Sequence, residues 1–171
     1  MGTRFNGDAR EVRALNAYIN LMRASESVAA PLTRRLAEIG LTISQFGALE
    51  ALLHLGPLNP CELGRKLLKS GGNMTMVIDN LEKRGLAERV RDPEDRRYLT
   101  VHLTRDGRKL IESVFPDHVR EIQERMGALT AAELDQLRTL CRKLGLAQAT
   151  ADDEVPIQRT RSKTSRKAQT P

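Results

Sequence analysis

The sequence is poor in cysteine and in aromatic residues. Its 171 residues include two cysteines, Cys61 and Cys141, no Trp, two Tyr and three Phe. It also lacks an apolar run long enough for a membrane span and a signal-peptide pattern, so we expect a protein of the reducing cytoplasm. The few aromatic side chains argue against single-stranded nucleic acid as a ligand, because proteins that bind it stack bases on aromatic rings.

Motifs for catalysis and metal binding are missing as well. His54, His102 and His118 lie on three different predicted elements without metal-ligand spacing, and no two cysteines are two residues apart, so no metal site is expected. The sequence has no nucleophile-plus-base motif and no glycine-rich phosphate loop. We therefore expect no enzyme and no cofactor. An enzyme that uses His54 or His118 with Cys61 is the weakest of three hypotheses.

Positive charge is concentrated in the middle third of the chain. The net charge is +6. Residues 65–109 carry 12 basic and 7 acidic side chains, whereas residues 1–64 carry 6 of each and residues 110–146 carry 5 and 6. A basic patch attracts a polyanion. Duplex DNA is therefore the expected partner of residues 65–109.

Apolar residues recur at helical spacing over much of the chain. Residues 8–39 predict a long amphipathic helix, in which Pro31 either causes a kink or starts a second helix. Capping residues predict the starts of three more helices, at Thr42, Asn59 and Ser70.

The helices that begin at Asn59 and Ser70 are separated by a tight Lys-Ser-Gly turn. The first of them is short and is expected to end near Lys69, and Gly85 ends the second. Two helices joined in this way predict a helix-turn-helix.

Two strands and a charged tip follow. Leu86 and Val90 are expected to share one face of the first strand, and the second strand alternates apolar residues with polar ones at Leu99, Val101 and Leu103. The connection between them, DPEDRR at residues 92–97, is almost entirely charged and longer than a tight hairpin requires. It predicts a wing that extends into solvent or DNA.

Two helices are expected after the hairpin, beginning at Thr104 and Thr130. Cys141 falls on the apolar stripe of the second one and is expected in the core. Past Gly145 the apolar pattern stops. Residues 147–171 are therefore predicted to be a disordered basic tail.

The helix that begins at Ser70 supplies the candidate DNA contacts. Its apolar residues place one stripe toward the core, and Asp79 faces outward with the contact candidates. These candidates are Ser70, Gly72, Asn73, Thr75, Met76, Asn80 and Lys83. On the wing, Arg96 and Arg97 are candidates for the minor groove, with Asp95 to hold a guanidinium. The competing interpretations are a solvated helix face and a weak surface ion pair.

Three stretches of the sequence resemble the MarR family of bacterial regulators. They are LTISQFGALEALLHLGP, SGGNMTMVIDNLEKRGLAER and DPEDRRYLTVHLTRDGRKL, and the whole resemblance covers about residues 12–145. It implies a mainly α fold with a small β-hairpin wing, in which a winged helix-turn-helix is combined with N- and C-terminal dimerisation helices. The implied domain is residues 1–146, with dimerisation helices at about 8–39 and 105–145 and a DNA-binding lobe at about 42–104.

The resemblance further implies a homodimeric repressor on a pseudo-palindromic operator. The helix from Ser70 would lie in the major groove and Arg97, oriented by Asp95, in the minor groove. Members are released by small phenolic, quinone or other aromatic compounds or by thiol oxidation, and GNMTMVIDNLEKRGL also resembles the branch that senses quinones and catechols. Met76 departs from the pattern, because many members have a basic or polar residue there. Base preference therefore does not carry over.

The expected effector pocket lies between the dimer helices and each lobe. Its candidate residues, each of which is alternatively core packing, are Tyr18, Met22, Phe46, His54 and Phe115. Cys61 is either a partly buried small residue or an oxidant sensor, because the dipole at a helix start lowers the pKa of a thiol. The redox cysteine best known in the family lies near the start of the first helix, where this chain has none.

The second hypothesis is an architectural protein that coats DNA with little sequence preference. The basic residues between Arg159 and Lys167 favour it. A repressor should prefer its own site to random duplex by about 10³-fold or more, so a titration at several salt concentrations separates the two hypotheses.

Overall fold

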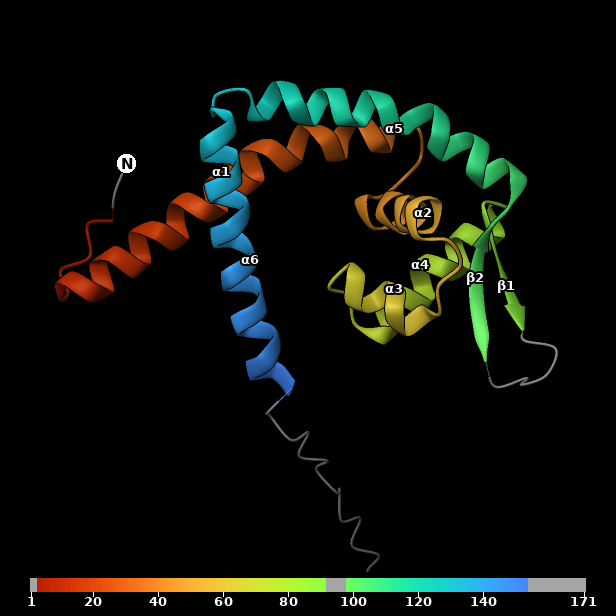
Figure 1. Ribbon diagram of the computed structural model, residues 1–171, viewed down its shortest axis with the longest axis horizontal. Coiled ribbons are helices and arrows are strands. Elements are labelled where there is room, and N and C mark those ends of the chain that lie inside the picture. The colour runs from red at the N-terminus through yellow and green to blue at the C-terminus, as the bar shows by residue number, and fades with distance from the viewer. Residues whose placement is uncertain (1–2, 92–97, 154–171) are drawn as a thin grey trace, which may run out of the picture. The chain divides into compact units, whose positions relative to one another are not determined.

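A computed structural model of the chain describes residues 3–91 and 98–153 (Figure 1). The chain divides into two units, Met1–Gly127 and Ala128–Pro171. In chain order the elements are α1 (Ala9–Glu38), α2 (Ile43–Leu55), α3 (Pro60–Lys66), α4 (Gly71–Lys83), β1 (Ala87–Arg91), β2 (Leu99–Leu103), α5 (Arg105–Met126) and α6 (Ala131–Asp153). The predicted fold class, mainly α with a winged helix-turn-helix, is confirmed.

The predicted capping residues begin their helices. The side-chain oxygen of each accepts a hydrogen bond from the backbone N–H three residues later, at 2.9–3.5 Å, in Thr42, Asn59, Ser70, Thr104 and Thr130. These bonds satisfy backbone donors that the first turn of a helix leaves without a partner. Short stretches of sequence therefore fix where these helices start.

Two helix boundaries could not be placed from the sequence alone. α1 continues through Pro31 as one helix, so Pro31 does not start a second helix. α3 ends at Lys66, not near Lys69 as expected, because Leu67 is its C-cap and Leu68 has a left-handed φ of 50°. The Lys69 N–H then donates to the Gly64 carbonyl at 2.9 Å and closes the turn.

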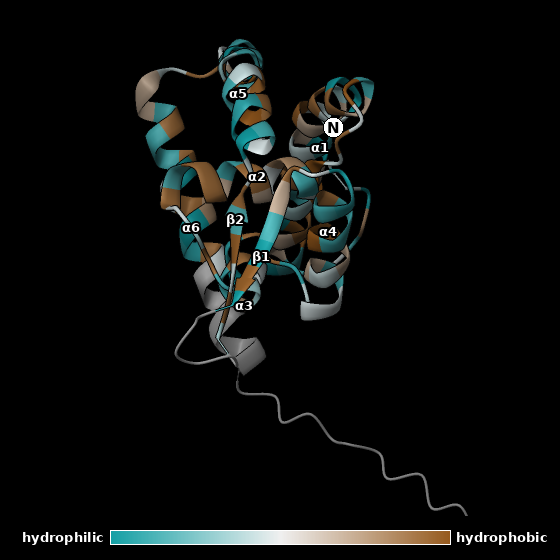
Figure 2. Ribbon diagram, turned by 90° about the vertical axis from the view of Figure 1, so that its right-hand side faces the viewer, coloured by the Kyte–Doolittle hydropathy of each residue, from teal (hydrophilic) through white to brown (hydrophobic). Residues whose placement is uncertain are grey.

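The core of the first unit lies where α2, α4 and α5 meet the hairpin and the end of α1. The C-terminal half of α1 runs beside α5 near the top of Figure 1, and α2, α3 and α4 gather beside the hairpin. The fully buried large side chains are Leu36, Leu41, Leu49, Leu63, Met74, Ile78, Leu81, Ile111 and Val101. Brown and teal residues share the surfaces of α4 and α5 in Figure 2, as amphipathic helices require.

The hairpin is antiparallel, and Ala87 pairs with Leu103 and Arg89 with Val101. The segment before α3 joins it, because the N–H and carbonyl of Leu58 exchange hydrogen bonds with those of Val101 at 3.3 and 2.8 Å. This pairing is a contact between distant residues that no local pattern indicated. It ties the start of the helix-turn-helix to the wing.

The buried face of β1 differs from the prediction. Ala87 is 3% exposed, whereas Val90 is 40% exposed. Leu86 is buried, but it lies in the turn before the strand, where its N–H bonds back to the Leu81 carbonyl. The alternation therefore cannot be counted from Leu86, and Ala87 and Arg89 occupy the inner positions.

The base of the hairpin is packed tightly against the start of α5. The Thr104 hydroxyl donates to the Gly85 carbonyl at 2.6 Å, and the Thr104 N–H donates to the Leu86 carbonyl at 3.2 Å. A Cβ on Gly107 would collide with the backbone of Leu86. Gly107 is therefore required for this close approach.

In the second unit, α6 runs to Asp153, past the point where disorder was predicted to begin at residue 147. Residues 147–151 are rich in alanine, which has the highest helix propensity and so extends a helix without an apolar stripe. Cys141 is exposed, not in the core as predicted. Leu137, Leu140 and Leu144 on the same stripe are exposed too, because an apolar stripe indicates which face a partner can cover and does not itself bury that face.

Within the part of the chain that the structure describes, no single helix is both long and apolar enough to cross a membrane, although α1 and α2, bent by 84°, together meet the length and composition criteria.

Candidate nucleic-acid interface

α4 is fixed by its buried side and presents a polar side to solvent. Met74, Ile78 and Leu81 are completely buried in the core. One turn of the opposite side exposes Asn73, Thr75 and Met76, and Met76 is 62% exposed. We call these three residues the recognition face. The core therefore fixes the rotation of α4 that the helical periodicity predicted.

The first turn of α4 is bare. Gly71 and Gly72 are exposed, and a Cβ built on either would meet no described atom within 4 Å. Glycine in a helix costs stability relative to alanine, and here no neighbour in residues 3–91 or 98–153 requires it. The backbone N–H groups of this turn, with the positive end of the helix dipole, are open to an anion.

The recognition face offers specific hydrogen-bonding groups. The Thr75 hydroxyl donates to the Gly71 carbonyl at 3.0 Å, so it presents an acceptor and a methyl group outward. The side-chain amide of Asn73 has no hydrogen-bond partner among the residues described. An amide of this kind can donate and accept at the edge of a base.

The other predicted α4 positions are less uniform. Lys83 is exposed, whereas Asn80 is half-buried. Asp79 is half-buried too: its side chain is 46% exposed, and it is paired with Arg89 of β1 at 2.6 Å, a contact that its helical angle alone did not indicate. The same guanidinium binds Glu82 through its other terminal nitrogen.

Further cations flank α4, and the list of predicted contacts omitted them. Lys66 and Lys69 are exposed on either side of the turn before Ser70. Arg84, at the other end of α4, donates to the Gly40 carbonyl at 2.5 Å and is engaged within the lobe. The concentration of basic residues in the middle third was the signal for Lys66 and Lys69.

The wing tip cannot be compared with its prediction. Asp95, Arg96 and Arg97 lie outside the described residues. The two strands that lead to the tip are described, and Arg91 and Tyr98 at their ends are exposed.

The candidate effector residues separate into two groups. Phe46, His54 and Phe115 form an aromatic cluster, in which the ring centroids of His54 and Phe115 are 4.8 Å apart. His118, which the prediction omitted, packs on Phe46 at 4.3 Å. Tyr18 and Met22 are 61% and 50% exposed on α1. They lie apart from this cluster. Arg35 of α1 lines a cavity together with His118, and Tyr18 is about 25 Å from Arg35 along the helix axis, at 1.5 Å per residue.

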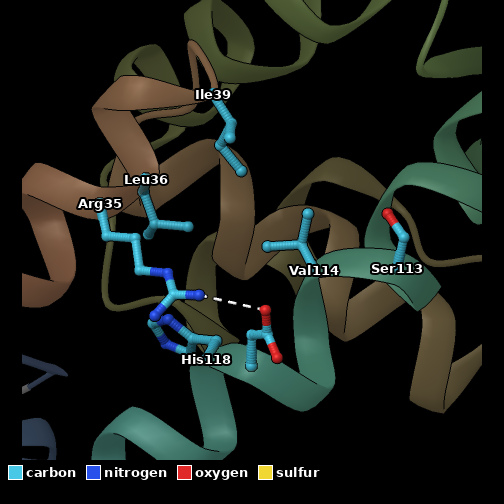
Figure 3. Close-up of a pocket in the computed structure, with 7 residues that line it drawn as sticks. Arg35, Leu36, Ile39, Ser113, Val114 and His118 are labelled. Atoms are coloured by element: carbon cyan, nitrogen blue, oxygen red, sulfur yellow. Dashed lines mark hydrogen bonds and ion pairs between the residues drawn. The ribbon is translucent and has the colours of Figure 1, made fainter.

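A cavity of about 120 Å³ lies between α1 and α5 beside this cluster (Figure 3). Its lining residues are Arg35, Leu36, Ile39, Ser113, Val114, Asp117 and His118. The dashed line in Figure 3 joins Arg35 to Asp117, which are 3.1 Å apart, and Arg35 also lies 3.5 Å from Glu121. Burial lowers the pKa of His118, and this effect outweighs the carboxylates of Glu50 and Glu121, which act to raise it. The cavity therefore combines the Arg35–Asp117 ion pair with the apolar side chains of Leu36, Ile39 and Val114.

Cys61 is exposed at the second position of α3. The interpretation of a partly buried small residue is therefore wrong. Its candidate role as an oxidant sensor stays a prediction.

The chain is similar to known regulators. The MarR family model matches residues 39–97. YkoM of Bacillus subtilis, an uncharacterized HTH-type transcriptional regulator, is 37% identical over 83% of this chain and 92% of its own length. A mutant of Escherichia coli MarR solved with operator DNA has a TM-score of 0.68 at 27% identity and covers 81% of this chain and 99% of its own.

The DNA binding of a third relative is regulated by a small molecule. BpsR of Bordetella bronchiseptica, solved to explain how 6-hydroxynicotinic acid regulates its DNA binding, has a TM-score of 0.68 at 30% identity, over 75% of this chain and 98% of its own. The similarity spans the helix-turn-helix, the hairpin and the flanking helices. The chain belongs to the MarR family of DNA-binding transcriptional regulators.

Proposed function

We propose that the chain is a homodimeric repressor that occupies a pseudo-palindromic operator and is released from it by a small aromatic compound. The observation that carries the DNA-binding part is the bare first turn of α4. Gly71 and Gly72 lower helix stability, and nothing among the described residues packs closely enough to require them. An external backbone that must approach closely supplies a reason for them.

In this proposal α4 lies in the major groove. Asn73 and Thr75 bond to base edges and Met76 packs on a thymine methyl, while Ser70 and Gly72 bring the helix start close to a phosphate. Asn80 and Lys83 extend the contact along the helix. Arg96 and Arg97 of the wing enter the minor groove, where Asp95 orients a guanidinium.

A dimer is supported by apolar side chains that a single chain leaves exposed. Tyr18, Leu21 and Met22 are exposed on α1, and Leu137, Leu140 and Leu144 are exposed on α6. Such residues on the terminal helices suit a symmetric partner. A two-fold dimer would then read half-sites about 34 Å apart.

An aromatic effector is supported by the cavity beside Phe46 and by BpsR, whose DNA binding 6-hydroxynicotinic acid regulates. A ring would stack in the aromatic cluster, where His54 and Phe115 are further candidates. Tyr18 and Met22 would contribute only where the partner chain brings them near. A ligand releases DNA only if it binds the two states unequally. Oxidation of Cys61 is the alternative trigger.

Selection of duplexes from a random pool, followed by shift assays on the selected site, tests the proposal. Asn73→Ala should reduce the preference for the site more than it reduces nonspecific affinity, whereas Lys66→Ala should weaken all duplexes alike. Lys109→Ala is the matched control, because Lys109 is exposed on α5, which begins at the end of the hairpin opposite its tip. A uniform loss with Asn73→Ala would contradict the assignment of base contacts.

Arg97→Ala tests the wing separately. It should weaken operator binding substantially and leave the dimer intact, as measured by shift assay and by sedimentation. Unchanged affinity would remove Arg97 from the interface.

An architectural role remains the second candidate, favoured by the basic residues between Arg159 and Lys167. It requires equal affinity for selected and random duplexes. A preference of about 10³-fold or more for the selected site favours the repressor.

A further inference from the structure

Arg89 connects the hairpin to α4 through contacts that DNA binding alone does not explain. It lies on the inner side of β1, paired with Val101, and its side chain is only 24% exposed. Its Nη2 lies 2.6 Å from Asp79 Oδ1, and its Nη1 contacts Glu82 Oε2. The Arg89 backbone N–H also donates to Glu82 Oε1 at 2.8 Å. Both the backbone and the side chain of one strand residue are therefore bonded to α4.

The two carboxylates are an unexpected choice for this place. Asp79 and Glu82 are three residues apart on α4, so they repel each other. They also lie on a helix whose neighbouring turns face a polyanion in the proposed function. Each would oppose phosphate if it were alone. Their pairing with one guanidinium explains why they are tolerated.

We propose that Arg89 is a positioning residue for sequence recognition: through Asp79 and Glu82 it locks the hairpin to α4, so that wing and recognition face approach their two grooves at a fixed separation. This inference rests on the proposed function. The bond is made within the chain, so Arg89 itself touches no phosphate. Its positioning effect on the preference for the operator is therefore separate from the general attraction to DNA that its charge contributes.

The proposal predicts opposite changes in affinity for random duplex when the cation or the two carboxylates of this interaction are removed. Arg89→Ala removes a cation and should lower affinity for random duplex, whereas Asp79→Ala with Glu82→Ala removes two anions and should raise it. Both variants break the same lock. Both should therefore lose preference for the operator over random duplex by about tenfold or more, the cost of a mismatched base pair.

The experiment measures affinity for the selected duplex and for a scrambled one across several salt concentrations. Arg89→Ala should reduce the slope of log K against log salt by much less than one, because Arg89 touches no phosphate. The variant that combines Arg89→Ala with Asp79→Ala and Glu82→Ala should have the same preference as Arg89→Ala, since one interaction is lost in each. Arg91→Ala is the matched cation control on the same strand, and Glu88→Ala is the carboxylate control. The first should lower and the second raise both affinities alike, with the preference kept.

Three results would overturn the inference. Arg89 would be a phosphate contact if Arg89→Ala reduced the salt slope by about one. It would be a purely structural residue if variants with unaltered circular dichroism kept the full preference. The carboxylates would be simple repellents if their removal raised affinity for both duplexes equally. Failure of the unmodified protein to prefer any duplex would instead reject the proposed function.

Discussion

The two ends of α4 differ in what holds their residues. At its C-terminal end, Asp79 and Glu82 are bonded to Arg89 and Arg84 is bonded to the Gly40 carbonyl. At its N-terminal end, Gly71 and Gly72 touch nothing that a side chain would displace. Contacts within the chain account for the residues at the first end, whereas none among the described residues accounts for the two glycines at the second, which our proposal assigns to DNA.

Two glycines illustrate this difference. Gly107 lies against the backbone of Leu86, where a Cβ has no room, whereas a Cβ on Gly72 would lie in open space. The same residue type therefore serves the fold in one place and, in our proposal, the ligand in the other. The variants below should separate stability from DNA binding accordingly.

The largest effect is expected from Gly107→Ala. The new methyl group would push the start of α5 away from Leu86 and weaken the bonds that Thr104 makes there, so the free energy of unfolding should fall by about 3 kcal/mol. Chemical denaturation measures it. If the variant unfolds at the same denaturant concentration as the unmodified protein, Gly107 is not required for the packing of α5 against Leu86.

Removal of the α4 cap should have an intermediate effect. Ser70→Ala deletes the acceptor for the Asn73 N–H and should lower the free energy of unfolding by about 1 kcal/mol. Ser113→Ala is the matched control, because Ser113 is exposed within α5 and its hydroxyl donates to the Leu110 carbonyl of its own helix. The control should be neutral or slightly stabilising. Equal losses would mean that the cap is not what starts α4.

A smaller effect of opposite sign is expected from Gly72→Ala. Alanine should stabilise the helix by about 0.5 kcal/mol, since helix propensity improves without a clash. Operator affinity should nevertheless fall, because the methyl group keeps the helix start away from phosphate. A variant that is more stable and binds equally well would show that the glycines have no role at the interface.

Local patterns predicted most of the fold. Caps such as Thr42 and Asn59 depend on residues three positions apart, so the sequence alone locates them. The stripe of Met74, Ile78 and Leu81 likewise fixed the rotation of α4. The prediction that Leu86 and Val90 share one face of a strand was wrong because Leu86 belongs to the turn before β1, so that Leu86 is buried and Val90 is exposed.

Contacts between distant elements were beyond prediction. The Arg89 bonds to α4 and the Leu58 bridge to Val101 depend on how the hairpin packs. The sequence could not place His118 against Phe46, because that contact joins α5 to α2. The candidate base contacts were proposed from the rotation of α4 alone. The contacts of Arg89 with Asp79 and Glu82 depend on how two elements pack, so the sequence did not indicate them.

The smallest effect on stability is expected from His118, a buried titratable group on α5 that, like Gly107, is held by contacts within the chain. Burial lowers its pKa in the folded protein, and Arg35 adds to this, while Glu50 and Glu121 oppose it. The unfolded chain therefore binds a proton more readily, so stability should decrease as the pH falls below about 6.5. The lowered pKa of Glu121, held down mainly by its hydrogen bond with Arg125, acts only below the usual carboxylate range. Denaturation midpoints between pH 7 and 5 thus isolate the histidine. The decrease should be smaller in His118→Gln, whatever the absolute stability of that variant, and an equal decrease in both proteins would assign it to another group.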